Sequence, residues 1–223
     1  MSNKFCFCAL ILVGIVFPSN IFGGQPNIAI QVIPEPKQIE TTNEIFKLKA
    51  GSAISPADSR SAADLFAAND FIADVKQTAN IALKIGRGNI LIGSLADSRI
   101  KKEFAKVNFQ IPADLSDEGY VLIVGANKII VGGKTEAGTF YGLQTLKQLV
   151  RGEGANVYVQ GVKIIDYPTM RYRAFSDDIS RGIVPKLDYV KRQIRTFAAL
   201  KMNMHSLYME HTFRSRSHPL FAP

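Results

Sequence analysis

Both cysteines of the 223-residue sequence, Cys6 and Cys8, lie within its first ten residues. Disulfide bonds, thiol nucleophiles and cysteine-based metal sites are therefore excluded for the rest of the chain. Any fold must be held together by its apolar core, and a hydrophobic content of 47% is enough to build one. We therefore expect packed secondary structure rather than a disulfide-stapled or disordered chain.

The segment that contains both cysteines has the pattern of a secretory signal peptide. Lys4 gives it a positive start, the run from Phe5 to Phe17 carries no charge, and Pro18 follows. The run is shorter than the ~20 residues that span a bilayer. We predict that residues 1–24 are a signal peptide. The mature protein is then exported to the periplasm or the cell exterior, without stable membrane insertion after cleavage.

The net charge of +8 is spread along the chain, and its groups are short pairs such as Lys101-Lys102 and Lys191-Arg192. Scattered cations indicate a solvated basic surface. No zinc-finger spacing or RNA-binding signature accompanies them, so we expect no nucleic-acid partner. A polyanion-binding role stays open as the weakest alternative, which a steep salt dependence of binding would support.

Apolar periodicity predicts alternating strands and helices up to residue 166. The predicted strands cover residues 44–49, 89–92, 120–124, 129–131 and 162–165, and the predicted helices cover 59–78 and 135–150. The turn at residues 125–128 joins two of these strands as a hairpin. Within an α/β chain, the pattern predicts a small α+β domain over residues 28–166, with an antiparallel or mixed sheet and helices.

A second domain is expected to begin at residue 167 and to run to residue 223. Residues 171–176 and 205–209 look like strands, and residues 186–200 look like an amphipathic helix between them. The helix is predicted to face inward with its apolar residues, Leu187, Val190, Ile194, Phe197 and Leu200. Strand, helix and strand make one βαβ unit, which cannot close a sheet alone. We therefore expect this domain to be truncated.

Two motifs that suggest a cofactor fail on spacing. Gly132-Gly133-Lys134-Thr135 lies between a strand and a helix, but Lys128 stands where a phosphate loop needs its first glycine. His205, His211 and His218 form neither an H-x-H nor an H-E-x-x-H pair. The sequence therefore predicts no metal ion and no organic cofactor.

Charged residues gather at the ends of the two predicted strands of the second domain. Asp178 ends the first strand with Arg181 three residues later, and Glu210 and His211 end the second. The carboxyl ends of parallel strands form the site face of α/β architectures. These four side chains are therefore candidates for one pocket, with a structural ion pair on a loop as the alternative.

Two blocks of sequence resemble the β-N-acetylhexosaminidases of glycoside hydrolase family 20. Residues 117–150 contain D-E-G-Y followed by E-A-G-T-F-Y-G-L-Q-T-L, which looks like the end of the non-catalytic N-terminal domain of that family. Residues 166–213 open on D-Y-P, Y-R and D-x-x-R, which match its first barrel strand, and K-M-N at 201–203 matches the entry to the second. With Pro34-Glu35-Pro36, the resemblance covers nearly all of the chain after the signal peptide.

The resemblance implies a fold and roles for residues. Residues 167–223 would begin a (β/α)₈ TIM barrel, which takes ~250 residues when complete. Arg181 matches the family arginine that binds sugar hydroxyls, and Asp178 matches the aspartate that orients this arginine or the strand-end loop. Glu210 or His211 stands where the family has its first aspartate, and Gly182 replaces a common histidine. These departures suggest a divergent subfamily.

The resemblance also implies a reaction on glycans that contain N-acetylhexosamine. Family members remove terminal β-linked GlcNAc or GalNAc with retention, and the acetamido oxygen of the substrate acts as nucleophile. An adjacent Asp-Glu pair on the fourth barrel strand orients the acetamide and serves as general acid/base. We expect no catalytic residue within this chain, so residues 1–223 alone should be inactive.

Two other functions stay open from the sequence, besides the polyanion-binding role. The protein could belong to another N-acetylglucosaminidase family of similar architecture. Finding the Asp-Glu pair downstream, in the family 20 context, would distinguish family 20 from that alternative. A secreted glycan-binding or scaffolding protein without activity would lack that pair. The oligomeric state and the linkage specificity have no sequence signal.

Overall fold

The computed structural model describes residues 30–210 and 215–220, so the predicted signal peptide and His211 lie outside the described residues. The strands are β1 Gln38–Lys47, β2 Ala53–Pro56, β3 Lys84–Ile85, β4 Ile90–Ser94, β5 Tyr120–Val124, β6 Ile129–Gly133, β7 Val150–Arg151, β8 Tyr158–Asp166, β9 Ala174–Asp178 and β10 Met204–Tyr208. The α-helices are α1 Ala62–Ala79, α2 Ser98–Lys106, α3 Glu136–Leu149 and α4 Leu187–Ala199, and a short 3₁₀ helix spans Gly154–Asn156.

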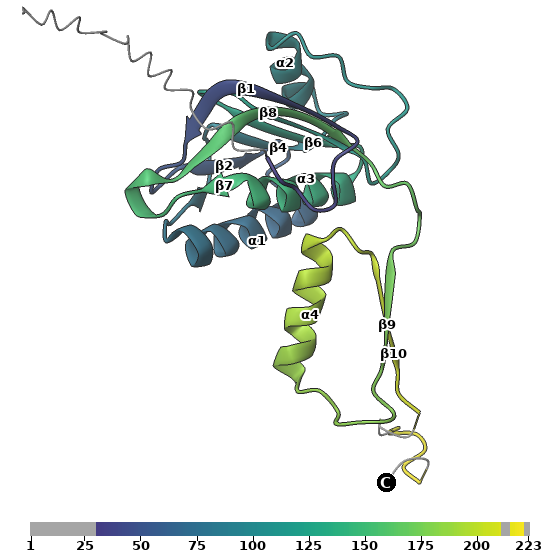
Figure 1. The fold of residues 1–223 in the computed structure, drawn as a ribbon. Coiled ribbons are helices and arrows are strands. Elements are labelled where there is room, and N and C mark those ends of the chain that lie inside the picture. Colours follow the sequence, from purple (N-terminus) through teal and green to yellow (C-terminus); the bar gives the residue numbers. More distant parts are fainter. Residues whose placement is uncertain (1–29, 211–214, 221–223) are drawn as a thin grey trace, which may run out of the picture.

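Up to Asp166 the described chain forms one mixed sheet in the order β1-β8-β5-β6-β4-β2-β3, with β7 paired to β8 (Figure 1). Strands β2, β3, β4 and β6 are parallel neighbours, whereas β5, β8 and β1 pair antiparallel. The predicted mixed sheet and the hairpin of β5 and β6 are therefore confirmed.

Helices cover both faces of this sheet, with α1 and α3 on one side and α2 on the other (Figure 1). The alternation along β5 shows why both faces need a cover. Tyr120 and Leu122 belong to the larger core under α1 and α3, whereas Val121 and Ile123 belong to the smaller core under α2. Successive side chains of a strand point to opposite faces, so an uninterrupted apolar strand must be buried on both sides.

Two motif glycines bring α3 close to the sheet. A Cβ at Gly138 would lie 2.2 Å from the backbone oxygen of Gly119, and one at Gly142 would lie 2.5 Å from Val131 Cγ1. Real Cβ atoms do not approach other heavy atoms so closely, so a side chain at either position would push the helix away. The glycines of the E-A-G-T-F-Y-G motif are therefore explained by packing.

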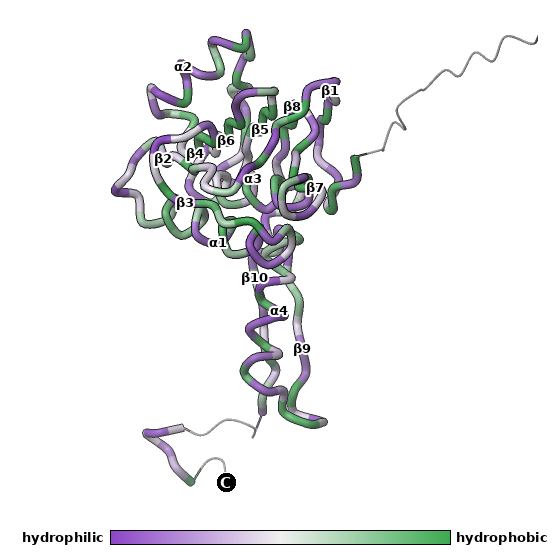
Figure 2. Tube along the Cα trace, turned by 90° about the vertical axis from the view of Figure 1, so that its left-hand side faces the viewer, coloured by the Kyte–Doolittle hydropathy of each residue, from purple (hydrophilic) through white to green (hydrophobic). Residues whose placement is uncertain are grey.

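Beyond Asp166 the chain leaves the sheet and forms a separate arm, defined here as residues 167–210. Its two strands, β9 and β10, are parallel and joined by α4, so the predicted βαβ unit is confirmed. The arm meets the small domain at one end and projects away from it, with hydrophobic and hydrophilic residues along its length (Figure 2). No closed barrel is formed by the residues that the structure describes.

The predicted inward face of α4 is wrong for this structure. Leu187 is 67% exposed and Ile194 is 49% exposed, and no residue of α4 is buried. Only Phe197 finds ring partners, with Phe175 at 5.0 Å and His205 at 5.2 Å between centroids. Two strands offer too little apolar surface to cover an amphipathic helix, so most of its apolar stripe stays in contact with solvent.

The sequence pattern did not predict α2, whose buried apolar contacts with the sheet come from Ile100 and Phe104. Its amino end is capped by Asp97, which accepts hydrogen bonds from the amides of Arg99 and Ile100. Within the described residues, no helix combines the length and apolar character needed to cross a membrane.

We expect Phe71→Ala to lower the free energy of unfolding by about 3–5 kcal/mol, because Phe71 is fully buried in the larger core. Phe66→Ala on the same helix is the matched control, since Phe66 is 65% exposed and should change stability by about 1 kcal/mol or less. Urea unfolding followed by circular dichroism measures both. Equal losses would show that α1 does not pack as described.

Candidate functional site

The candidate residues lie at the carboxyl ends of the two arm strands. Asp178 and Tyr208 are register partners at the ends of β9 and β10, and the Ile179 amide extends the ladder to the Tyr208 carbonyl at 3.0 Å. This end of the arm points away from the small domain (Figure 1). The structure therefore brings Asp178 and Glu210 to the same end of one parallel strand pair.

Asp178 holds the loop that follows its strand. Its Oδ1 accepts hydrogen bonds from the Ser180 amide at 2.9 Å and the Ser180 hydroxyl at 2.6 Å. These hydrogen bonds, helped by the nearby charge of Arg181, hold the pKa of Asp178 below its ordinary value. Asp178 is therefore ionised at neutral pH, and it orients the strand-end loop.

Glu210 is engaged by the phenol of Tyr208. The Tyr208 hydroxyl donates to Glu210 Oε1 at 2.8 Å, and this bond together with the carboxylate charge raises the pKa of Tyr208. Glu210 has a φ of 44°, which is uncommon for a residue with a side chain. Such strain is found at sites where the surroundings hold a side chain in one direction.

Arg181 is exposed three residues after Asp178 and its charge reaches that carboxylate, but no salt bridge joins the two in the described part of the chain. Its guanidinium is thus free to offer its fork of donors to a ligand. Carboxylates, a phenol and a guanidinium at one strand end can donate to and accept from the hydroxyls of a polar ligand. The roles assigned to Asp178, Arg181, Glu210 and His211 stay predictions.

A second polar cluster lies at the opposite end of the arm, where it meets the small domain. The Lys201 ammonium donates to Asp166 Oδ2 at 2.7 Å and to the Tyr120 hydroxyl at 2.9 Å, and Tyr120 donates to Asp166 at 2.9 Å. All three residues are at least 90% buried. We call Lys201, Asp166 and Tyr120 the junction triad.

Burial shapes the proton affinities of the triad. Desolvation lowers the pKa of Lys201, and the Asp166 charge opposes this effect. Desolvation, and then Asp166, raise the pKa of Tyr120 well above its ordinary value. At neutral pH the phenol is therefore a neutral donor between a cation and an anion.

Lys201 also ends helix α4 in an unusual way. It has a φ of 59°, the left-handed conformation that glycine usually supplies at this position. The Lys201 amide bonds to the Ala198 carbonyl at 2.9 Å, and the Met202 amide bonds to the Phe197 carbonyl at 2.9 Å. This is a Schellman cap with a lysine in the position that glycine usually occupies. The stabilisation from the buried ammonium must therefore exceed the conformational cost of the left-handed backbone at Lys201.

A second set of contacts at the junction explains the remaining motif residues. Arg173 Nη2 forms a salt bridge with Glu118 Oε2, and Asn203 Nδ2 donates to Glu118 Oε1 at 3.1 Å. Arg173 Nε also bonds to the Lys201 carbonyl at 2.6 Å. Glu118 follows Asp117 in an adjacent Asp-Glu pair, but both of its oxygens are occupied, so this pair is structural.

Carboxylates also surround a small hollow of 150 Å³ in the small domain, lined by Asp58, Asp64, Asp97 and Glu136 among others. Burial first, and then the charge of Glu136, raise the pKa of Asp64 from its ordinary value of 3.8. Among the described residues no group of three or more His, Cys, Asp or Glu side chains is arranged to hold a metal ion.

Comparison with protein families matches residues 29–167 to the model described as Glycosyl hydrolase family 20, domain 2. A Porphyromonas gingivalis beta-hexosaminidase is 29% identical over 182 residues, which cover 78% of this chain and 22% of that protein. A Cellulomonas fimi beta-N-acetylhexosaminidase is 25% identical, over 82% of this chain and 35% of that protein. The chain thus spans about a fifth to a third of the length of these relatives.

Solved structures share the fold. A mutant Streptomyces plicatus beta-hexosaminidase in complex with its product GlcNAc gives a TM-score of 0.68 at 25% identity, over 86% of this chain and 37% of that one. A GH20 exo beta-N-acetylglucosaminidase from Vibrio harveyi gives a TM-score of 0.70 at 19% identity, over 85% and 28% of the two chains. The second similarity establishes the fold alone.

We expect Lys201→Met to lower the free energy of unfolding by about 3–5 kcal/mol, because it leaves the Asp166 carboxylate buried without its cation. Lys163→Met is the matched control, since its ion pair with Glu40 is exposed and should contribute about 1 kcal/mol or less. Chemical unfolding measures stability, and hydrogen exchange of β10 reports whether the arm loosens. Equal effects of the two changes would contradict the role of the triad.

We expect Asp64→Asn to stabilise the chain at pH 7 and to lose this benefit below pH 3.8. The raised pKa means that the folded state binds this proton more tightly, so stability falls as pH rises through the folded-state pKa. Thermal unfolding across pH measures the difference, with Asp114→Asn as the control, since Asp114 is exposed and lies outside the hollow. A loss of stability at pH 7 would show that the hydrogen bond with Ser61 outweighs burial.

Proposed function

Since the chain belongs to glycosyl hydrolase family 20, we propose that the whole protein removes terminal β-linked N-acetylhexosamine, GlcNAc or GalNAc, from glycans. The observation that carries this proposal is the domain-2 match over residues 29–167, together with curated relatives that are beta-hexosaminidases. These relatives extend the similarity to 78% of the chain or more, beyond the small domain and into the arm.

In this proposal the arm is the first βαβ unit of a (β/α)₈ barrel. Its parallel strands and connecting helix fit the repeating unit of that fold. The exposed apolar residues of α4, such as Leu187 and Ile194, would be buried once further strands and helices extend the sheet. Catalytic groups of such barrels lie at the carboxyl ends of the strands, where Asp178 and Glu210 lie.

Arg181 is the proposed sugar-binding residue. Its exposed guanidinium can donate two parallel hydrogen bonds to neighbouring sugar hydroxyls. Asp178 supports it by fixing the loop through Ser180, and Glu210, oriented by Tyr208, is the second candidate for a sugar contact. His211 is a weaker candidate next to Glu210.

The proposed reaction is substrate-assisted, as family membership implies. The acetamido oxygen of the sugar attacks the anomeric carbon while a general acid gives its proton to the departing oxygen, which forms an oxazolinium-type intermediate. Water then attacks the same carbon as the resulting base takes the proton, so the anomeric configuration is retained. In this proposal the Asp-Glu pair for these steps belongs to a barrel strand outside residues 1–223, and this chain binds and orients the sugar.

We further propose that the protein is exported and acts on glycans outside the cytoplasm. The N-terminal pattern of Lys4, an uncharged apolar run and Pro18 supports this location. Edman sequencing of the secreted mature protein tests it, because the proposal expects a new amino terminus near residue 25.

In the protein with its whole barrel, we expect Arg181→Ala to lower kcat/KM for an aryl N-acetyl-β-hexosaminide by about 2–4 kcal/mol of transition-state stabilisation. Charge-assisted hydrogen bonds to the sugar would be lost, and each contributes about 1.5–3 kcal/mol. Arg60→Ala is the control, since the Arg60 side chain is 91% exposed on the small domain and should leave turnover unchanged.

The Arg181→Ala and Arg60→Ala variants must also be equally stable for this comparison, and thermal unfolding measures their stability. Unchanged kcat/KM in Arg181→Ala would remove this residue from the site while leaving the hydrolase function in place. A protein that binds N-acetylhexosamine but releases no aryl group would instead support a non-catalytic glycan-binding role.

A further inference from the structure

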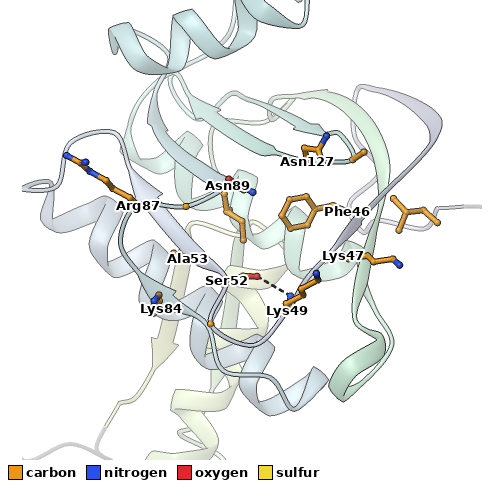
Figure 3. A pocket seen from close by; sticks show the side chains of 14 residues that line it. Phe46, Lys47, Lys49, Ser52, Ala53, Lys84, Arg87, Asn89 and Asn127 are labelled. Carbon is orange, nitrogen blue, oxygen red and sulfur yellow. Dashed lines mark hydrogen bonds between the residues drawn. The ribbon is translucent and has the colours of Figure 1, made fainter.

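A hollow of 570 Å³ lies at the strand ends of the sheet, on the side opposite the junction (Figure 3). It is framed by the end of β1, the starts of β2 and β4, the segment around β3, and the turn between β5 and β6. The strand register places it opposite the junction. Ile90 and Ile129 pair at the strand ends beside the hollow, whereas Tyr120 pairs with Asp166 at the opposite strand ends. We call it the basic hollow.

Cationic residues from separate segments of the chain line the basic hollow. The lining contains no aspartate or glutamate, and its cationic residues are Lys47, Lys49, Lys84 and Arg87. Lys84 and Arg87 lie on one side in Figure 3, and Lys47 and Lys49 lie on the other. These residues look scattered in the sequence, and only the fold gathers them.

None of these four cations forms a salt bridge with a carboxylate among the residues that the structure describes. Lysines elsewhere do so, including Lys128, Lys147 and Lys201. Glu44 lies beside the turn at Gly125, next to the lining but not part of it. Unpaired like charges around a concave surface repel one another and produce a positive field that attracts anions.

The wall between the two cationic sides is polar and braced by the backbone. Asn89, Asn127 and Ser52 line it with amides and a hydroxyl (Figure 3). The Lys84 amide bonds to the Ser52 carbonyl at 3.1 Å, and the Lys49 amide bonds to the Ser52 hydroxyl at 3.1 Å. The hollow is therefore held in shape without a ligand, and its volume lies in the range of ligand sites, about 300–1,000 Å³.

We propose that the basic hollow binds acidic glycan chains through their sulfate or carboxylate groups. Amides and hydroxyls suit the sugar hydroxyls, and the flanking ammonium and guanidinium groups suit the anions. The lining has no exposed aromatic ring, since Phe46 is 5% exposed, so it lacks the stacking platform that single-stranded nucleic acids use. The choice of a glycan as the carrier of the anion rests on the proposed function.

A titration that requires no hydrolysis tests this proposal on the chain itself. A labelled heparin fragment carries sulfate and carboxylate, a hyaluronan fragment carries carboxylate only, and a chitooligosaccharide of equal length carries no charge. The hollow variant is Lys49→Gln/Lys84→Gln/Arg87→Gln. The matched control Lys76→Gln/Lys101→Gln/Lys102→Gln removes the same charge from exposed positions on α1 and α2.

We expect the heparin fragment to bind the unchanged chain, and the hollow variant to bind it at least about tenfold more weakly. The control should stay within about twofold of the unchanged chain, because exposed charges on another surface are screened by salt. Circular dichroism verifies that both variants fold. Binding of the hyaluronan fragment would identify carboxylate as a sufficient anion, and binding of heparin alone would identify sulfate.

Four results would overturn the proposal. They are no binding of either acidic fragment, equal losses in both triple variants, equal binding of the uncharged oligosaccharide, and tighter binding of a DNA oligonucleotide of matched charge. Because only binding is measured, any of them leaves the hydrolysis of N-acetylhexosaminides untouched. Loss of that hydrolase activity in the whole protein would in turn leave the titration result standing.

Discussion

A buried ammonium connects the two parts of this protein. Lys201 reaches from the end of α4 to Asp166 at the end of β8, and Tyr120 bonds to both. The Lys201–Asp166 ion pair is buried, and a buried ion without its partner has a large free-energy cost. The arm therefore cannot move away from the small domain without leaving one of these charges unpaired. The direction of β9 and β10, and with it the position of their carboxyl ends, depends on this contact.

The small domain provides the rigid base for that contact. Its central strands are apolar on both faces and are covered by α1 and α3 on one side and α2 on the other. The close approach of α3 at Gly138 and Gly142 places Thr145 within 2.5 Å of the Tyr120 hydroxyl. Packing of the core thus sets the geometry of the polar junction, and the junction sets the orientation of the proposed sugar-binding end.

The sequence predicted those elements whose signals are local. The hairpin of β5 and β6, helices α1 and α3, and the βαβ arm follow from periodicity and turn residues, and the structure confirms them. Helix α2 was missed because only Ile100 and Phe104 mark its buried face. The motif residues Asp166 and Lys201 were noticed by resemblance, but their pairing needs the tertiary fold. The basic hollow had no sequence signal, since its cations come from positions 47 to 87 and meet only through strand register.

The left-handed lysine at the end of α4 limits how freely these two parts can be exchanged between relatives. A sequence boundary at residue 167 separates Asp166 and Tyr120 from Lys201, although the three form one buried unit. A chimera that joins this small domain to a barrel from another protein would have to import Lys201, Arg173 and Asn203 along with it. The contacting surfaces of the small domain and the arm must therefore be exchanged together, because neither surface keeps its buried partners without the other.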